Sequence, residues 1–346
     1  MKEFKKGIRF KWNVMRVGFL FLFAGMLIFL SGVGSFASSE KPIPISIYCI
    51  LSKSSVLTQA EFKFAELVEQ RTNGRVKFDI YHSGELGGDV ETIEAMRLGT
   101  IDMRMAGVGL HSHFYPQAQM LELPFLFKDR KHVQRFLYSP AGRRFMDGFE
   151  KYGVKCLNIL DIGFRGISNS KRPVNSVEDV KGIKIRVPEI DTYVRVWKKF
   201  GASPVAMAWP DVYMALKTGV IDAQDNAPEH TYTNKTYETQ KYYSVINYIW
   251  MGGALTMNLN KWKSLPKDIQ DVMMKAAQEV SEWTFKELAA KDEWALTKME
   301  EAGLQVNRHP DIESFRKLAE ELYAEFAKQP WYDAKLVEEI RRLEKE

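Results

Sequence analysis

Apolar and polar residues alternate in several short stretches of the chain, whereas longer stretches carry apolar residues at helical spacing. Val76, Phe78 and Ile80 alternate with polar residues, as in a strand with one buried face. The pattern predicts strands over residues 44–50, 76–80, 100–105, 154–161 and 183–187. It predicts helices over residues 57–68, 132–152, 192–200 and 211–216, and one beginning at residue 89. Because strands and helices alternate, we expect an α/β fold with a mainly parallel sheet covered by helices.

One apolar stripe near the end of the chain is much longer than the others. Ile269, Met273, Ala276 and Val280 follow one face of a helix that begins near Pro266 and stops before Gly303. At a rise of 1.5 Å per residue such a helix reaches about 55 Å, which exceeds the width of one small domain. The helix must therefore bend or bridge two lobes. A final helix is predicted over residues 312–327.

The first 37 residues differ from the rest of the chain in charge and hydropathy. Basic residues precede an apolar run over residues 17–30, and Ser35-Phe36-Ala37 fits a small-residue cleavage signal. The run is short for a membrane span, so a cleaved signal peptide over residues 1–37 is favoured over an anchor. With no cysteine near Ala37, we expect a freely soluble exported protein, periplasmic in a Gram-negative bacterium.

The excess of positive charge belongs to this leader. The chain has 49 Lys and Arg residues against 44 Asp and Glu residues, and the first 37 residues hold six of the basic and one of the acidic residues. The remainder therefore has 43 of each sign. A balanced mature chain has no global basic field to recruit nucleic acid or an anionic membrane, and we expect no nucleic-acid partner.

The two cysteines lie in apolar stretches that read as strands. Cys49 follows Ile47 and Tyr48, and Cys156 precedes Leu157. Export permits a disulfide, but a bridge requires that these two strands be adjacent. Buried free thiols are therefore the preferred interpretation.

Two arginines stand where predicted segments end. Arg186 closes the strand that Pro188 stops, and Arg165 lies between Gly163 and Gly166, where the chain is expected to cross into a second lobe. The planar guanidinium of arginine donates two parallel hydrogen bonds to a carboxylate, so two converging arginines suit an anionic solute. On spacing alone, a solvated arginine at the strand edge remains an alternative for Arg186.

Several motifs occur in a fixed order along the chain. They are Gly84-Glu-Leu-Gly-Gly-Asp89, Leu123-Pro-Phe-Leu-Phe127, the run from Gly163 to Pro188, Asp211-Val-Tyr-Met-Ala-Leu-Lys-Thr-Gly219, and Ile221-Asp-Ala-Gln-Asp-Asn226. Together they resemble the solute-binding subunits of TRAP transporters of the DctP type, over nearly all of the chain after the leader. The resemblance implies a two-lobed, periplasmic-binding-protein-like fold with a cleft between the lobes and a long helix bridging both.

The resemblance also implies roles for two of these residues and for Asn226. Arg186 matches the arginine that pairs with the solute carboxylate, and Arg165 matches one that assists it. Asn226 matches the family's amide, which can donate to and accept from solute oxygens. Asp225 stands where the family usually has glutamate. From the residues alone, Asn226 also fits a loop asparagine that holds its own turn.

Three further candidates rest on the same resemblance. Trp209 matches an aromatic residue beside the solute, although a purely structural tryptophan is the alternative. Asp89 matches a position that touches the solute, or it caps the helix that begins there. Tyr237 is the last ligand-binding candidate. Where sialic-acid-binding members carry a glutamate, this chain reads Ala106-Gly107-Val108, which indicates a different and smaller solute.

The residues that other functions would need are incomplete in this sequence. His111 and His113 offer two imidazoles without a third ligand at motif spacing, so a polar loop is favoured over a metal site. A secreted hydrolase using Asp211, His230 or the His111/His113 pair lacks an ordered set of nucleophile, base and acid. A sensor that hands the solute to a receptor instead of a permease stays open.

The sequence and the resemblance together give a working prediction. Residues 40–163 and 252–291 form lobe I, and residues 164–251 and 292–346 form lobe II, with Gly163 and Gly252-Gly253 as hinges. The protein is a monomeric binding protein without enzymatic activity, metal or cofactor. It delivers a small organic acid to the small and large membrane subunits of a TRAP transporter driven by an ion gradient.

Overall fold

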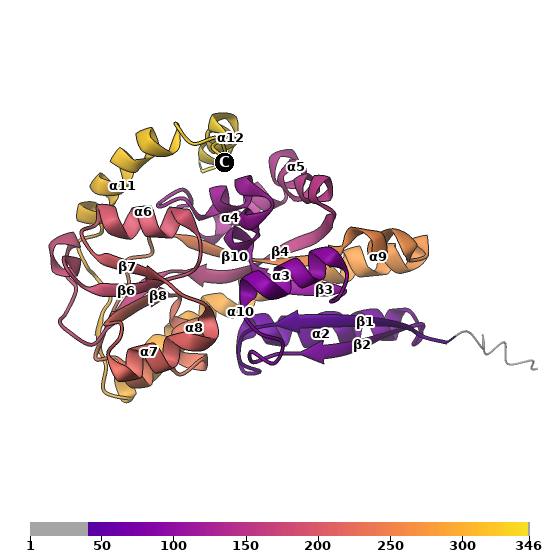
Figure 1. Ribbon diagram of the computed structural model, residues 1–346, viewed down its shortest axis with the longest axis horizontal. Helices are drawn as coiled ribbons and strands as arrows, with labels where there is room; N and C mark the ends of the chain where they lie inside the picture. The colour runs from indigo at the N-terminus through magenta and orange to yellow at the C-terminus, as the bar shows by residue number, and fades with distance from the viewer. Residues whose placement is uncertain (1–40, 345–346) are drawn as a thin grey trace, which may run out of the picture. The chain divides into compact units, whose positions relative to one another are not determined.

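The strands form two sheets that lie side by side in the computed structural model (Figure 1). The structure describes residues 41–344, and the predicted signal peptide lies outside them. The strand order is β2-β1-β3-β10-β4 in the first sheet and β11-β9-β5-β8-β6-β7 in the second. The strands are β1 (Ile43–Cys49), β2 (Val76–Tyr81), β3 (Met103–Gly107), β4 (Val154–Phe164), β5 (Gly166–Asn169), β6 (Lys184–Val187), β7 (Ser203–Ala206), β8 (Ala223–Asn226), β9 (Tyr242–Ser244), β10 (Trp250–Asn258) and β11 (Gln305–Asn307).

Each sheet combines a parallel part with antiparallel neighbours. In the first sheet β1 is parallel to β2 and β3, whereas β10 runs antiparallel between β3 and β4. In the second sheet β6 is parallel to β7 and β8, and β5 is antiparallel to β8 and β9. The expected α/β class is confirmed, and the antiparallel strands are β10 in the first sheet and β5 in the second.

Two of the connections between the sheets run side by side, one from β4 to β5 and the other from β9 to β10. Only Arg165 separates β4 from β5, and its backbone N–H donates to the Ile249 carbonyl at 2.9 Å while its own carbonyl accepts from the Tyr248 N–H at 3.3 Å. Ile162 bulges out of the pairing of β4 with β10, and Gly163 follows with φ +108°. A Cβ on Gly163 would lie 2.8 Å from the Ala227 Cβ, so glycine is required by both conformation and space.

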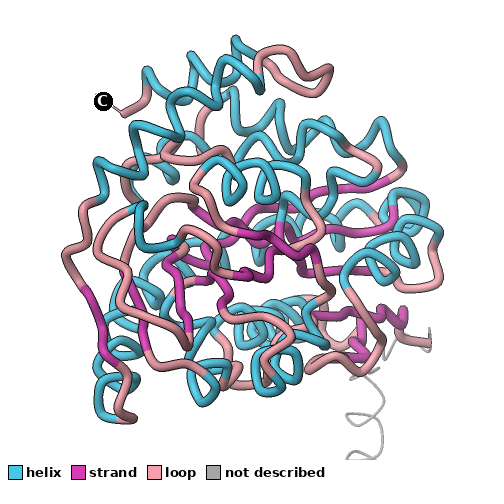
Figure 2. Tube along the Cα trace, turned by 60° about the vertical axis from the view of Figure 1, so that its left-hand side comes forward, coloured by secondary structure: helices cyan, strands magenta, loops and turns pink. Residues whose placement is uncertain are grey.

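Helices surround the strands of both sheets (Figure 2). One of them, α10 (Lys267–Glu301), has 35 residues and packs against β4 in the first sheet as well as β11 in the second. The predicted bridging helix is therefore confirmed. The other α-helices are α2 (Val56–Arg71), α3 (Asp89–Leu98), α4 (Arg130–Leu137), α5 (Pro140–Asp147), α6 (Asp191–Lys199), α7 (Val212–Thr218), α8 (Pro228–Thr233), α9 (Leu259–Ser264), α11 (Ile312–Phe326) and α12 (Ala334–Arg342).

The helix predicted over residues 132–152 is divided into α4, α5 and a 3-10 turn, Gly148–Tyr152. The reason is local. Pro140 cannot donate an intrahelical hydrogen bond, and the Ser139 hydroxyl caps a new helix by accepting from the Gly142 N–H at 3.2 Å.

The C-terminal helix α12 lies against α4 and α5, next to the first sheet. The His132 Nε2 is 2.7 Å from the Ile340 carbonyl, and Arg144 forms an ion pair with Glu339 at 2.6 Å. The ranges expected from sequence grouped these residues with lobe II, so the chain returns to the first sheet once more than expected.

Two further observations bear on the sequence interpretation. Cys49 and Cys156 are buried free thiols, as predicted, and burial raises the pKa of each to about 12. Within residues 41–344, no helix combines the length and the apolar composition that crossing a bilayer requires.

Candidate functional site

Five of the six candidate residues line one cavity beside the crossover between the sheets. They are Asp89, Arg165, Arg186, Trp209 and Asn226. The cavity encloses about 460 Å³ of space not filled by atoms, some of it open to solvent. Its walls include the carboxyl ends of parallel strands from both sheets, the usual location of ligand sites in α/β folds.

Arg186, on β6, is a buried cation without an anionic partner. Its side chain is about 5 % exposed, and Nε and Nη2 both donate to the Met207 carbonyl, at 2.9 and 2.8 Å. Its guanidinium lies 5.3 Å from the centre of the Trp209 ring. No carboxylate among the described residues forms an ion pair with it. Burial, and then the charge of Arg165, lower the pKa of Arg186 to about 10, so it remains cationic at neutral pH.

Arg165 is equally buried, but its charge is compensated. Its Nε donates to the Asp225 Oδ2 at 2.8 Å and its Nη2 to Oδ1 at 3.1 Å. The Asp225 carboxylate also accepts a hydrogen bond from the Tyr248 hydroxyl, and the guanidinium lies 4.8 Å from the Tyr193 ring centre. The ion pair explains why an acid is needed at position 225 and fixes Arg165 at the base of the cavity.

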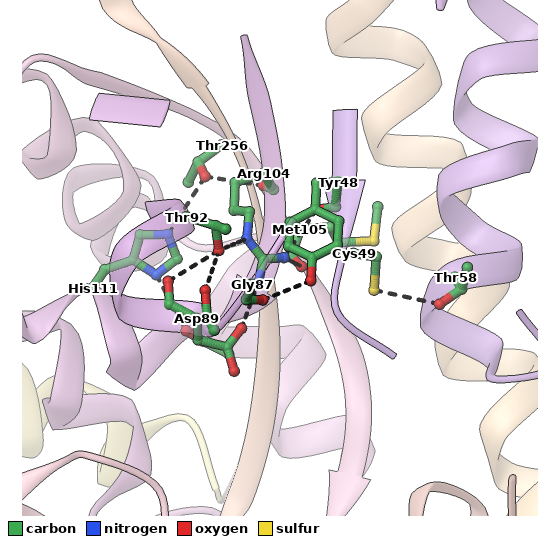
Figure 3. Close-up of polar contacts among 12 residues, drawn as sticks. Tyr48, Cys49, Thr58, Gly87, Asp89, Thr92, Arg104, Met105, His111 and Thr256 are labelled. Atoms are coloured by element: carbon green, nitrogen blue, oxygen red, sulfur yellow. Dashed lines mark hydrogen bonds and ion pairs between the residues drawn. The ribbon is translucent and has the colours of Figure 1, made fainter. Parts of the chain in front are cut away.

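Asp89 is held by an arginine that the sequence did not single out (Figure 3). Arg104, fully buried on β3, donates from Nη2 to the Asp89 Oδ1 at 2.5 Å, from Nε to the Thr92 hydroxyl and from Nη1 to the Tyr48 carbonyl. Asp89 is the first residue of α3, Gly88 occupies the capping position, and the Asp89 side chain caps nothing. The helix-cap interpretation is therefore wrong. Burial raises the pKa of Asp89 although Arg104 opposes the shift.

Asn226 and Trp209 complete the wall on the side of the second sheet. Asn226 ends β8; its side-chain amide donates to the Gln224 Oε1, and its backbone carbonyl accepts from the Tyr243 hydroxyl at 2.8 Å. Trp209 opens a 3-10 turn, Trp209–Asp211, that follows β7, and its indole forms an apolar wall of the cavity. The apolar face of a small acid can pack on such a ring.

His230 also lines the cavity, and it was not predicted as a ligand-binding residue. It lies on α8, which begins two residues after Asn226, and its ring meets Trp209 edge to face at 4.6 Å. Burial, and then the charges of Arg165 and Arg186, hold its pKa well below the usual range. The sequence held one signal: Pro228 starts a helix directly after a strand end, so early residues of that helix stay near the cavity.

Comparison with known proteins agrees with this arrangement. The model of the bacterial extracellular solute-binding proteins, family 7 (DctP), matches residues 49–329. The chain belongs to this family. It is 30% identical over 290 residues to the 2,3-diketo-L-gulonate-binding periplasmic protein YiaO of Escherichia coli, covering 83% of this chain and 88% of that protein.

Two further matches extend the comparison. The C4-dicarboxylate-binding periplasmic protein DctP of Rhodobacter capsulatus is 30% identical over 264 residues, covering 76% of this chain and 79% of that protein. A TRAP periplasmic solute-binding protein from Polaromonas bound to D-erythronate superposes with a TM-score of 0.83 at 29% identity, covering 86% of this chain and 98% of that chain. The two-lobed fold and the role in solute binding for TRAP transport follow from membership of the DctP family.

The remaining candidates lie away from the cavity. Tyr237 stacks on Tyr232 at 4.8 Å between ring centres and is not among the lining residues. His111 is buried, with Nδ1 3.2 Å from the Gly107 carbonyl, whereas His113 is exposed, so the two do not share a polar loop. Residues 41–344 contain no cluster of three or more His, Cys, Asp or Glu side chains suited to a metal ion.

Family membership and the positions of the candidate catalytic residues both argue against the hydrolase alternative. Proteins of the DctP family are solute-binding proteins, not enzymes. Asp211 is exposed at the end of its 3-10 turn, whereas His230 is buried in the cavity wall. The proposed acid and base therefore do not face one reacting group.

Proposed function

We propose that this protein captures a small organic acid between its lobes, with Arg186 binding the carboxylate, and delivers the acid to the small and large membrane subunits of a TRAP transporter. The observation that carries the proposal is the buried guanidinium of Arg186, whose hydrogen-bond partner among the described residues is a carbonyl oxygen and not a carboxylate. A buried, uncompensated cation is costly, and a carboxylate in the adjacent cavity offsets that cost.

The cavity provides the other contacts that such a solute needs. Each charge-assisted hydrogen bond contributes about 1.5–3 kcal/mol, so a bidentate contact to Arg186 dominates the binding free energy. Arg165 adds positive potential, Asn226 contacts solute oxygens, and Trp209 covers the apolar face of the carbon chain. Asp89 is suited to accept from a hydroxyl group of the solute. The similar proteins named above bind 2,3-diketo-L-gulonate, C4-dicarboxylates and D-erythronate, all of which carry a carboxylate.

We propose further that the lobes close on the solute. The segment after β1 and helix α8 meet at one side of the cavity: the Val56 N–H donates to Glu229 at 2.8 Å, and the Ser52 N–H donates to the Asn234 side chain at 3.0 Å. These bonds join the ranges proposed for lobe I (40–163 and 252–291) to those for lobe II (164–251 and 292–346). Gly163 and Gly252-Gly253 are the proposed hinge positions.

The proposed setting is the periplasm. A cleaved signal peptide over residues 1–37 exports the chain, which then works as a monomer and hands its solute to the membrane subunits. Balanced charge in the mature chain and its similarity to periplasmic proteins support this setting.

A thermal-shift screen tests the proposal. The mature protein is heated with a panel of C3 to C6 organic acids and, as controls, with neutral polyols and amines of the same length. At least one acid is expected to raise Tm in a concentration-dependent way, because a ligand that binds only the folded state stabilises it. Stabilisation by a polyol or an amine, with none by any acid, contradicts the proposal.

A further inference from the structure

His230 lines the cavity and has unsatisfied hydrogen-bonding groups. Its side chain is about 6 % exposed, and both ring nitrogens are buried without a hydrogen-bond partner among the described residues. Leaving a buried polar group unpaired costs about 1–3 kcal/mol, and native proteins rarely tolerate it. Since His230 lines the cavity, a group of the bound solute is the natural partner for these nitrogens.

The charge state of His230 determines which solute group fits. Burial disfavours the imidazolium form of His230 most, and the charges of Arg165 and Arg186 disfavour it further, so its pKa lies well below the usual range. A neutral imidazole presents one N–H donor and one acceptor nitrogen. A hydroxyl group suits either nitrogen, because it can accept from the N–H or donate to the unprotonated nitrogen. A carboxylate can only accept, and it adds a negative charge.

The balance of charges around the cavity limits the solute to one carboxylate. Arg165 is paired with Asp225 and Arg104 with Asp89, so each of these cations is neutralised by the protein itself. Arg186 remains as the one uncompensated cation among the charged residues that line the cavity. A second solute carboxylate would meet the Asp89 carboxylate in the same wall, with no free cation to offset the repulsion.

One nearby acid outside the lining set strengthens this limit. Glu122 is buried, accepts from the Gly109 N–H at 3.1 Å and has a pKa raised by burial to about 7, while Arg165 opposes the shift. Any ionisation of Glu122 adds negative charge near the cavity. It therefore disfavours a second solute carboxylate still further.

From these contacts we infer that the solute is a hydroxylated monocarboxylate, with its single carboxylate on Arg186 and a hydroxyl group on His230. The inference rests on the proposed function and narrows its substrate class. Asp89 accepts from a further hydroxyl of the solute. Dicarboxylates and unsubstituted fatty acids are excluded, the first by charge and the second because they leave His230 unpaired.

Matched acids test the inference by isothermal titration calorimetry on the mature protein. At four carbons the set is erythronate and threonate, the tartrates, and butyrate; at six carbons it is gluconate and galactonate, the corresponding aldarates, and hexanoate. Within a set, the diacid replaces one terminal CH₂OH by a carboxylate, and the plain acid lacks all hydroxyls. A hydroxylated monoacid is expected to bind at least about tenfold more tightly than its matched diacid and plain acid, from one lost hydrogen bond or one added repulsion.

Variants at His230 test its role directly. His230→Phe keeps the aromatic contact with Trp209 and removes both nitrogens, so the preferred hydroxy acid should lose at least about tenfold in affinity. His230→Asn, which restores a donor and an acceptor, should recover part of that loss. His309→Phe, at an exposed histidine whose side chain forms no hydrogen bond among the described residues, should change nothing. Circular dichroism and Tm confirm that each variant is folded.

The outcomes separate this inference from the proposed function. Tighter binding of the diacids or of the plain acids in both sets overturns the substrate class while leaving a carboxylate-binding protein. Unchanged hydroxy-acid affinity in His230→Phe, or a loss that His230→Asn does not reduce, overturns the role of His230. Absence of binding by every acid overturns the proposed function, and this inference with it.

Discussion

Replacing Arg186 by alanine is the sharpest test of the site. The substitution removes the guanidinium whose Nε and Nη2 are oriented by the Met207 carbonyl, at 2.9 and 2.8 Å. This double anchor leaves Nη1, and the second hydrogen on Nη2, to bind a carboxylate in the cavity. The arginine is therefore preorganised, and little side-chain entropy is lost when the solute binds.

The size of the effect follows from the contacts that are lost. Two charge-assisted hydrogen bonds contribute about 1.5–3 kcal/mol each, and without Arg186 the solute carboxylate has no uncompensated cation in the cavity. We expect a loss of at least about 3 kcal/mol, which corresponds to more than about a hundredfold in Kd. Arg186→Lys keeps the charge but not the fork, so it should recover only part of this loss.

Calorimetry with the best acid from the screen measures the effect. The matched control is Arg195→Ala, which removes a partly exposed arginine on α6 that pairs only with Asp191, one turn away. That control should bind like the wild type. Because Arg186 is a buried charge without an anionic partner, the unliganded Arg186→Ala protein should keep at least the wild-type Tm. Wild-type affinity in Arg186→Ala would refute the reasoning, as would an equal loss in the control.

Three further outcomes are expected. Trp209→Ala should weaken binding and remove most of the ligand-induced change in fluorescence, and an unaltered signal would make Trp209 purely structural. Burial raises the pKa of Glu229 to about 8, so wild-type stability should fall, by an amount on the order of a few kcal/mol, as pH rises from about 4.5 to about 8. Glu229→Gln, which keeps an acceptor for the Val56 N–H, should lessen that fall; parallel Tm profiles would contradict this. X-ray scattering should show a more compact protein with solute than without, whereas superimposable curves would argue against closure of the lobes.

The sequence predicted well those parts of the fold that depend on local pattern. Apolar and polar residues alternate in the strand that carries Arg186, and Pro188 follows its last residue, so its position could be predicted directly. The 35-residue helix α10 was predicted from the length of its apolar stripe. By contrast, all nine residues of β10 are buried, and a strand buried on both faces has no alternation to detect. Its antiparallel place between β3 and β4 depends on contacts far apart in sequence.

Site residues could be predicted where a suitable residue type occurs within a recognisable motif. They were harder to predict where a residue's role depends on a contact with a residue far away in the sequence. The predicted residues Arg165, Arg186 and Asn226 all line the cavity. Arg104 escaped notice, because a buried arginine in an apolar strand gains its meaning only from the Asp89 carboxylate that it meets. His230 was named only in the hydrolase alternative. Its place in the cavity wall could not be predicted, because its neighbour Trp209 is 21 positions away in the sequence and only the fold brings the two rings together.

Arg165 occupies the backbone position at which the two connecting strands pair. The proposed rotation of one sheet against the other would have to be accommodated along this line and along α10, so atoms here would travel least. Arg186 lies on β6, which pairs with β8 next to Asp225, so Arg165, Asp225 and Arg186 would move together in the proposed closure. Opening would then separate these residues from Asp89 on the side of the first sheet, so a departing acid would lose its contacts there before its carboxylate leaves Arg186.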